Sequence, residues 1–223
     1  MTSDVLVFDV NETLLEMQAM DPLFHEAFGT TEARREWFAS LLLYAQVATL
    51  AGPYADFGDI AGATLTMTAE RRGLVLPNAQ RERILDGMKH LPAHADVPGA
   101  LGRLATAGFR LVALSNSGQA TLGAQLVNAG LTELFERVFS VESLGRYKPA
   151  PEAYRAVGRE LGVDMARLRM VAAHAWDIVG ALRAGCAGAF VARPGCVWYP
   201  LAARPDVSGP DLEAIADQLI AQR

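Results

Sequence analysis

Three polar groups in the sequence each come directly after a short apolar run, and their residue types suit covalent catalysis. The groups are Asp9, Ser115 and the segment His174–Asp177. A carboxylate at a strand end can attack an sp3 carbon and displace a leaving group, which leaves an ester that water then hydrolyses. An imidazole titrates near neutral pH and can take a proton from that water. Asp9 is therefore a candidate nucleophile and His174 a candidate general base.

Strand-like and helix-like segments alternate from about residue 98 onward. Such alternation predicts an α/β fold, a parallel sheet with helices on both faces. The active site of such a sheet lies at the carboxyl ends of its strands, so the three polar groups are expected to converge there. The expected strands are Val5–Asp9, Leu111–Leu114, Arg137–Ser140, Met170–Ala173 and Ala189–Val191, and the expected helices are Gly99–Ala107, Asp177–Ala184 and Asp211–Gln222.

The segment between the first two expected strands has a different pattern, with helical apolar spacing and few strand signals. The helices expected there are Glu32–Leu50, Phe57–Arg72 and Asn78–Lys89. A helical cap over the strand ends would exclude water and supply side chains that contact a substrate. The sequence therefore predicts a core domain of residues 1–15 and 92–223, with a helical cap of residues 16–91 inserted after the first strand.

Four short segments contain these polar groups and most of the other candidate site residues. They are Phe8–Glu16, Leu114–Ser117, Tyr147–Tyr154 and Ala172–Asp177. In this order and spacing nearly the whole chain resembles the haloacid dehalogenase superfamily, and its Tyr-Lys-Pro and His-Ala-Trp-Asp segments resemble the type II (L-2-haloacid) dehalogenases. The resemblance implies a Rossmann-like core with a cap, and hydrolysis of a small 2-haloalkanoic acid through an aspartyl ester. The products would be a 2-hydroxy acid and halide, and the mechanism requires no metal or other cofactor.

The resemblance also implies roles for side chains around Asp9. Thr13 matches a threonine that orients the nucleophile. Lys148 matches a lysine that keeps the nucleophile ionised and stabilises developing negative charge. Ser115 and Asn116 match donors that hold the substrate carboxylate or the nucleophile, although this pair also suits an ordinary turn.

Four further positions belong to the expected site. Tyr154 matches a tyrosine of the same network, although a packed helical tyrosine explains it equally well. Asp177 is the one acid of the fourth segment and is expected to be a catalytic residue, and Val10 and Asn11 are expected to contact the substrate. Asn11 stands where phosphatases of the superfamily carry Asp. In those phosphatases the Asp acts as a general acid and lies beside magnesium. An amide cannot take that role, because it cannot donate and recover a proton near pH 7. A phosphatase of a small phosphate ester is thus the second interpretation, and a non-catalytic small-molecule binding module is the third.

His174 departs from the best-known type II dehalogenases, which have Asn at this position. We interpret it as the general base that hydrolyses the ester on Asp9. A base of this kind needs a carboxylate that orients it, and Glu12 and Glu16 are both candidates because both follow Asp9 closely. We favour Glu16, which occupies the place where the family usually has Asp, whereas Glu12 replaces the usual Gly.

Phe38 is the second departure, because the type II family has Arg at this position, directly after a cap Trp. A phenyl ring cannot pair with a carboxylate, although its positive edge can face a halide weakly. Arg34 and Arg35 lie one turn earlier, where we expect surface exposure, and their use in place of the family Arg is left open. Phe38, Phe57 and Trp176 suit an apolar pocket for a small haloalkanoate, and they suit an ordinary core as well.

Composition limits the remaining classes. The chain has 223 residues, 51% of them hydrophobic, and a net charge of −5. It lacks the long basic run of a nucleic-acid-binding protein, a secretory signal and an apolar stretch of membrane-spanning length. Cys186 and Cys196 are expected to be reduced thiols. We therefore expect a cytoplasmic protein whose partner is a small halocarboxylate; relatives are often homodimers, and the sequence leaves that state open.

Overall fold

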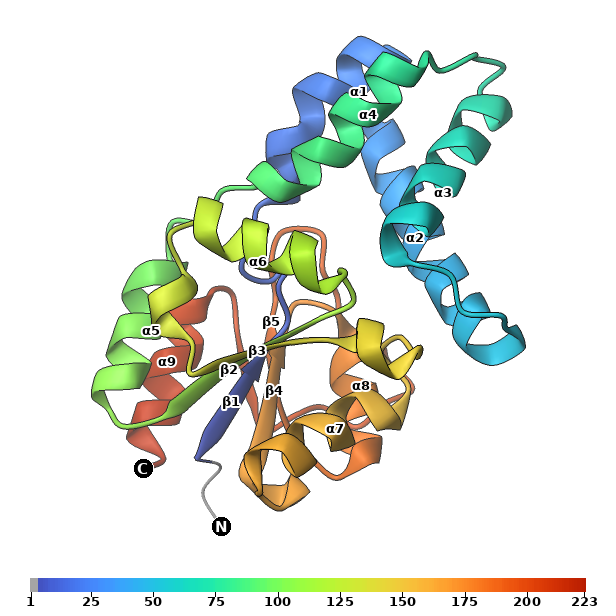
Figure 1. Cartoon of the computed structure of the whole chain (residues 1–223). Coiled ribbons are helices and arrows are strands. Elements are labelled where there is room, and N and C mark those ends of the chain that lie inside the picture. Colours follow the sequence, from blue (N-terminus) through green and yellow to red (C-terminus); the bar gives the residue numbers. More distant parts are fainter. Residues whose placement is uncertain (1–3) are drawn as a thin grey trace.

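The computed structural model describes residues 4–223, so the first three residues of the expected core lie outside the described range. The described residues contain a six-stranded sheet in which every strand is parallel to its neighbours, in the order β3-β2-β1-β4-β5-β6 (Figure 1). The strands are β1 (Val5–Phe8), β2 (Arg110–Ser115), β3 (Arg137–Ser140), β4 (Leu168–Ala172), β5 (Ala187–Val191) and β6 (Val207–Gly209). The predicted α/β fold is confirmed.

Helices cover both faces of the sheet, which explains why the central strand β1 is apolar throughout rather than alternating. The helices of the core are α5 (Val97–Thr106), α6 (Gln119–Asn128), α7 (Pro151–Leu161), α8 (Ala175–Ala184) and α9 (Leu212–Ala221). α5 and α9 pack together on one face, and α7 and α8 pack together on the other (Figure 1). Every residue of β1 and β4 is buried, so β1 lies at the centre of the hydrophobic core.

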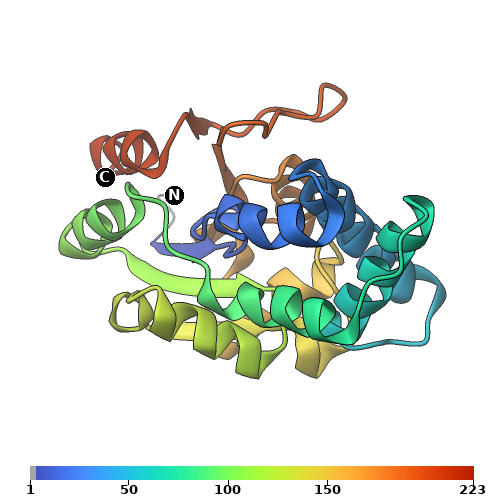
Figure 2. The same cartoon turned by 90° about the horizontal axis from the view of Figure 1, so that it is seen from above.

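A helical insertion, residues 16–91, lies between β1 and β2 in the sequence. Its helices are α1 (Asp21–Phe28), α2 (Glu32–Ala51), α3 (Phe57–Arg71) and α4 (Asn78–Gly87). It stands beyond the carboxyl ends of the strands in Figure 1, and the view from above in Figure 2 places it on the side away from α5 and α9. The two chain segments that join it to the core run side by side, because the Glu16 N–H donates to the Pro92 carbonyl at 2.8 Å.

Several elements were not predicted. β6 is a three-residue Val-Ser-Gly strand without an apolar run. α7 begins with Pro151, which fits the first turn of a helix because the missing N–H has no intrahelical partner there. α1 and α6 are short helices of eight and ten residues; α1 follows a 3-10 turn at Met17–Met20 and carries Asp21 and Pro22 in its first turn, which is a start signal that sequence analysis missed, whereas α6 has no side-chain cap. The predicted helices agree with the structure to within about two residues at each end, which is the usual uncertainty of helix ends.

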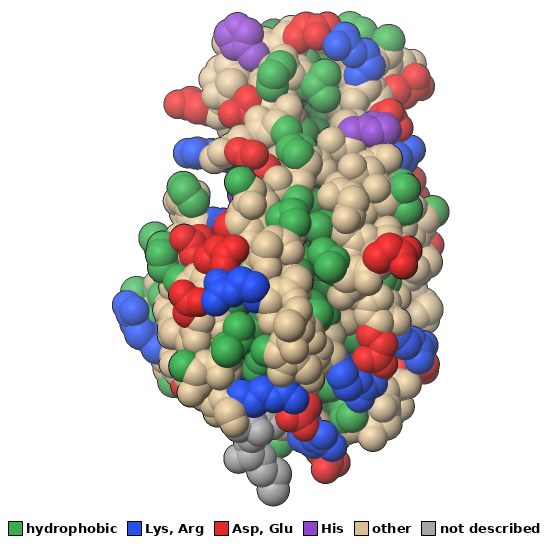
Figure 3. Space-filling view, turned by 90° about the vertical axis from the view of Figure 1, so that its left-hand side faces the viewer, with side chains coloured by type: hydrophobic (Ala, Val, Ile, Leu, Met, Phe, Trp, Pro, Cys, Tyr) green, Lys and Arg blue, Asp and Glu red, His purple; other side chains and the backbone are tan. Residues whose placement is uncertain are grey.

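The surface carries charges of both signs. On the face shown in Figure 3, acidic and basic side chains are interspersed rather than separated into large patches of one sign. Within residues 4–223, no helix combines the length and the apolar character needed to cross a membrane. Cys186 and Cys196 are free thiols, as expected.

Candidate active site

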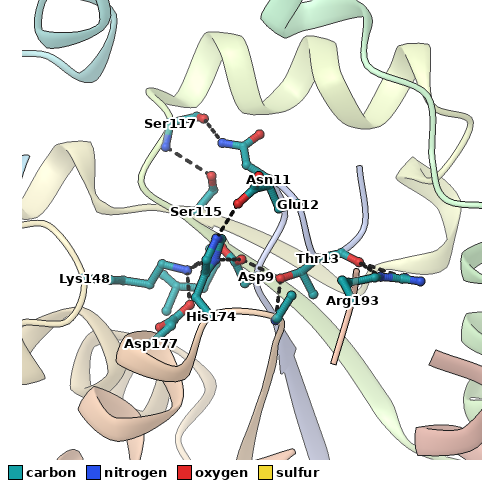
Figure 4. A network of polar contacts seen from close by, with 12 residues as sticks. Asp9, Asn11, Glu12, Thr13, Ser115, Ser117, Lys148, His174, Asp177 and Arg193 are labelled. Carbon is teal, nitrogen blue, oxygen red and sulfur yellow. Dashed lines mark hydrogen bonds and ion pairs between the residues drawn. The ribbon is translucent and has the colours of Figure 1, made fainter. Parts of the chain in front are cut away.

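The candidate active site lies where β1, β2 and β4 end, under the helical insertion (Figures 1 and 4). Asp9 follows β1 directly, and its N–H donates to the Val171 carbonyl of β4 at 3.0 Å. Only 5% of the residue is exposed. Because β2 and β4 flank β1, Ser115 and His174 lie around the same pocket as Asp9, at the edge of the sheet where the sequence predicted that they converge.

Both oxygens of the Asp9 carboxylate accept hydrogen bonds. Oδ1 accepts from Lys148 Nζ at 2.8 Å. Oδ2 accepts from Thr13 Oγ1 at 2.6 Å and lies 3.2 Å from His174 Nδ1. Burial alone would raise the pKa of Asp9, but the charges of Lys148 and His174 outweigh it and hold that pKa far below its ordinary value. The carboxylate is therefore ionised and fixed in direction, as a nucleophile must be.

Lys148 joins Asp9 to a second buried acid. Its Nζ lies 2.7 Å from Asp177 Oδ2 and donates to the Leu114 carbonyl at 3.0 Å, and the residue is 1% exposed. Tyr154 donates its hydroxyl to Asp177 Oδ1 at 2.6 Å. Burial would lower the pKa of Lys148, yet the charges of Asp177 and Asp9 raise it above the usual lysine value. Lys148 is thus a fixed ammonium group, and Tyr154 belongs to the network, as the resemblance implied.

The residues present do not fit the magnesium ion that superfamily phosphatases use. The oxygens of Asp9 and Asp177 are all engaged by Lys148 or by neighbouring donors. Magnesium requires free carboxylate oxygens in near-octahedral geometry. Among residues 4–223, no cluster of three or more His, Cys, Asp or Glu side chains is arranged to hold a metal ion. A lysine ammonium therefore occupies the space between the two carboxylates.

His174 contacts two carboxylates, one through each ring nitrogen. Nδ1 faces Asp9, and Nε2 lies 2.8 Å from Glu12 Oε2. Burial would lower the pKa of His174, but its hydrogen bonds to Asp9 and Glu12 raise that pKa to about 9. With both nitrogens protonated, the ring donates to both acids, so the resting site holds an imidazolium between two carboxylates.

The preference for Glu16 as the partner of His174 is wrong, since Glu12 makes that contact. Glu16 is held at the junction with the insertion by its N–H bond to Pro92. Glu12 adopts a left-handed backbone with φ of 62°, which favours Gly and strains other residues. This explains why the family usually has Gly here. In this chain the strained backbone directs the Glu12 carboxylate at the imidazole.

A buried arginine fixes the loop that follows Asp9. Arg193 donates from Nε and Nη2 to the Thr13 carbonyl, at 3.2 and 3.0 Å, and pairs with Asp96 at 2.8 Å. The Thr13 hydroxyl also accepts from the Ala173 N–H at 2.9 Å. Thr13 is thus held from two sides while it donates to Asp9. Sequence analysis missed Arg193, which lies in an irregular loop after β5 and carries no local signal.

Asn11 is turned into a network of amides rather than toward Asp9 (Figure 4). Its Nδ2 donates to Ser117 Oγ at 3.1 Å, and its Oδ1 accepts from Gln125 Nε2 at 2.9 Å. Gln125 also donates to the Met88 carbonyl of the insertion at 2.8 Å. Gln125 was not predicted either, because its burial depends on the packing of α6 against the insertion. Val10 is fully buried and its side chain lies in the hydrophobic core, so its expected substrate contact stays a prediction that only its backbone can fulfil.

Ser115 and Asn116 also serve the fold. Ser115 Oγ accepts from the Ser117 N–H at 3.1 Å, and Asn116 Oδ1 accepts from the Lys148 N–H at 2.9 Å. Both line a small pocket next to Asp9 that has polar and apolar walls. The other residues around this pocket are Asn11, Phe38, Leu42, Phe57, His174 and Trp176. The three aromatic residues predicted to line a pocket therefore do so, and Trp176 stacks on the His174 ring at 5.2 Å between centroids.

A second, larger cavity of about 540 Å³ lies between the insertion and the core. It shares Phe38, Leu42 and His174 with the small pocket, so these side chains separate the two spaces. Arg34 lines it and is 3% exposed, so the expectation that Arg34 lies on the surface is wrong. A sequence signal for this burial existed, because Arg34 shares one face of α2 with the buried Trp37, Phe38 and Leu41.

Comparisons with known proteins identify the family of the chain. A model of the family described as haloacid dehalogenase-like hydrolase matches residues 4–185. The chain therefore belongs to the haloacid dehalogenase-like hydrolases.

Within that family the chain is similar to (S)-2-haloacid dehalogenase 1 of Pseudomonas sp. strain CBS-3, with 34% identity over 78% of each chain. Its fold matches L-2-haloacid dehalogenase from Xanthobacter autotrophicus with a TM-score of 0.93, 27% identity and full coverage of both chains. The structure of that enzyme with chloropropionic acid covalently bound matches with a TM-score of 0.92, 25% identity and full coverage of both chains.

Proposed function

We propose that the protein is a hydrolytic dehalogenase of small 2-haloalkanoic acids that works through an ester on Asp9. One observation carries the proposal: a buried, ionised Asp9 carboxylate, fixed by Lys148, Thr13 and His174, borders a small aromatic pocket. This arrangement suits attack on a carbon whose leaving group needs no proton. The similarity to (S)-2-haloacid dehalogenases, one of them with chloropropionic acid covalently bound, supports the same chemistry.

In the first step one oxygen of Asp9 attacks carbon 2 of the substrate from the side opposite the halogen. The new C–O bond forms as the carbon–halogen bond breaks, and the halide leaves with the bonding electron pair. Configuration at carbon 2 inverts. The aromatic rings of Phe38, Phe57 and Trp176 give the small substrate pocket its apolar walls, and the positive ring edges can face the departing halide.

In the second step water attacks the carboxyl carbon of the Asp9 ester. Ester formation removes the negative charge of Asp9, which is one of the groups that hold the proton on His174. The imidazolium then loses that proton to solvent through the larger cavity, which His174 lines, and neutral His174 takes a proton from the attacking water. Cleavage of the bond between the carboxyl carbon and the ester oxygen releases an alkoxide, which takes the proton of the added hydroxyl, so that the 2-hydroxy acid leaves, Asp9 is again a carboxylate and His174 is again protonated. The product oxygen thus comes from Asp9, and one proton is released per turnover.

The helical insertion acts as a cap in this proposal. It supplies Phe38 and Phe57 to the pocket from α2 and α3, and it covers the strand ends. A covered pocket strengthens the charge interactions around Asp9, because water is excluded. The phosphatase interpretation has little support, since Asn11 is tied to Ser117 and Gln125 and cannot act as an acid.

The test is halide release from both enantiomers of 2-chloropropionate and from chloro-, bromo- and fluoroacetate, in the presence of a chelator. We expect release by the wild type, none by Asp9→Asn, and normal release by Asp164→Asn, the same change at an exposed acid in the core. Single turnover in ¹⁸O-water should give unlabelled product and labelled Asp9. Absence of release from every acid, or full activity of Asp9→Asn, would overturn the proposal.

A further inference from the structure

Arg34 links the helical insertion to the catalytic loop of the core. Its Nε donates to Asp21 Oδ1 of α1 at 2.5 Å, and its Nη1 lies 3.9 Å from Glu12 Oε1. The side chain is 3% exposed, whereas that of Glu12 is 28% exposed. A buried guanidinium thus bridges an acid of the insertion and an acid of the core, and its ion pair with Glu12 crosses the boundary between them.

The ion pair extends a row of alternating charges that begins at the nucleophile. Asp9 Oδ2 lies 3.2 Å from His174 Nδ1, and His174 Nε2 lies 2.8 Å from Glu12 Oε2. The other oxygen of Glu12 faces Arg34, which is held in turn by Asp21. Negative and positive groups therefore alternate without a break from the end of β1 to the start of α1.

Glu12 has two opposing effects on a base at His174. It orients the ring, but its negative charge also favours the protonated ring, which cannot accept a proton from water. Esterification of Asp9 removes only one of the two carboxylates beside His174. A positive charge next to Glu12 reduces its stabilisation of the protonated ring and leaves the hydrogen bond between Glu12 and His174 in place. The other titratable or charged side chains around His174, besides Lys148 on Asp9, are those of the larger cavity, Glu16, Arg35, His94, Arg193, Cys196 and Asp211.

We propose that Arg34 is a positioning residue for ester hydrolysis, which balances the charge of Glu12 across the boundary so that Glu12 orients His174 without keeping it protonated. This inference rests on the proposed function. It also means that the base is fully effective only while α2 is docked on the core, since Arg34 belongs to the insertion.

An NMR titration of His174 tests the charge balance without any substrate. The chain has four histidines, so the signal of His174 is identified by its loss in His174→Asn. Loss of a neighbouring positive charge should raise the midpoint by about one pH unit in Arg34→Gln. The midpoint should stay near the wild-type value in Arg34→Lys and in Arg83→Gln, whose arginine pairs with Glu26 on the exposed surface of the insertion. Asp21→Asn removes the other acid that pairs with Arg34, which leaves more of the arginine charge for Glu12, so this variant should lower the midpoint of the His174 titration.

Kinetics provide the second arm. Arg34→Gln should release the first equivalent of halide at the wild-type rate, accumulate the Asp9 ester and turn over about tenfold more slowly at pH 7. Raising the pH by about two units should restore most of the turnover, because the base is then deprotonated again. An unchanged His174 midpoint in Arg34→Gln and Asp21→Asn, or a loss of turnover that is equal at every pH, would overturn the inference. A wild type that releases no halide but shows the expected titration would count against the proposed function alone.

Discussion

Two replacements of Glu12 distinguish the free-energy cost of its left-handed backbone from the contribution of its carboxylate, which orients His174. A left-handed backbone costs a residue other than Gly about 1–2 kcal/mol, and Glu12 has φ of 62°. Its hydrogen bond to His174, between charged groups, is worth about 1.5–3 kcal/mol. Glu12→Gly removes both contributions, whereas Glu12→Gln keeps the strain and removes the charge. We therefore expect the Gly variant to be more stable than the Gln variant by about 1 kcal/mol.

Catalysis should not follow stability in this pair. Both variants leave His174 without its orienting carboxylate, so we expect ester hydrolysis to slow by about a hundredfold in each, toward the lower end of what a general base contributes. Denaturation in urea gives the free energies of unfolding, and rapid quenching with mass spectrometry of the Asp9 peptide measures the ester. A Glu12→Gly variant that hydrolyses its ester at the wild-type rate would refute the role of Glu12. Equal stability of the two variants would refute the claim of backbone strain.

Two further predictions concern the charges around the nucleophile. Lys148→Met leaves the carboxylates of Asp9 and Asp177 buried together without a cation, so we expect a loss of about 3–5 kcal/mol of stability by denaturation and no burst of halide; a normal burst would contradict the role of Lys148. His174 has its pKa raised from 6.5 to about 9 by folding, so its contribution is complete below pH 6.5 and is lost as the pH rises through 9. The free energy of unfolding should therefore fall by about 3 kcal/mol more between pH 6.5 and 9 in the wild type than in His174→Asn, and parallel pH profiles would disprove it.

The sequence was sufficient to predict the parts of the site that follow strands. Asp9 and the segment His174–Asp177 each end an apolar run, and parallel strands bring such ends to one edge of the sheet. Lys148 follows no such regular pattern and was placed by the resemblance. The helical insertion was also predictable, because its apolar spacing differs from that of the core.

The errors concern residues whose position depends on contacts distant in the sequence. The order of Glu12 and Glu16 after Asp9 could not show which of them turns toward the imidazole, because that choice depends on a left-handed backbone at Glu12. Gln125 and Arg193 act through partners 114 and 180 residues away. The error at Arg34 has a different origin. Its burial could have been predicted from the sequence, because the helical periodicity of α2 places it on the buried face beside Phe38.

Arg193 is distant in the sequence from the loop that it fixes, so the order in which the chain is synthesised bears on the geometry around Asp9. Asp9 and Thr13 leave the ribosome well before Arg193, because the guanidinium that fixes the Thr13 carbonyl follows Thr13 by 180 residues. It lies beyond residue 185, where the match to the family model ends, and its Asp96 partner also accepts from the N–H of Leu212 at the start of α9. A chain shortened at that boundary would keep Asp9, Lys148 and His174 and lose the brace behind them. A segment that is translated later therefore completes the geometry of one that is translated 180 residues earlier.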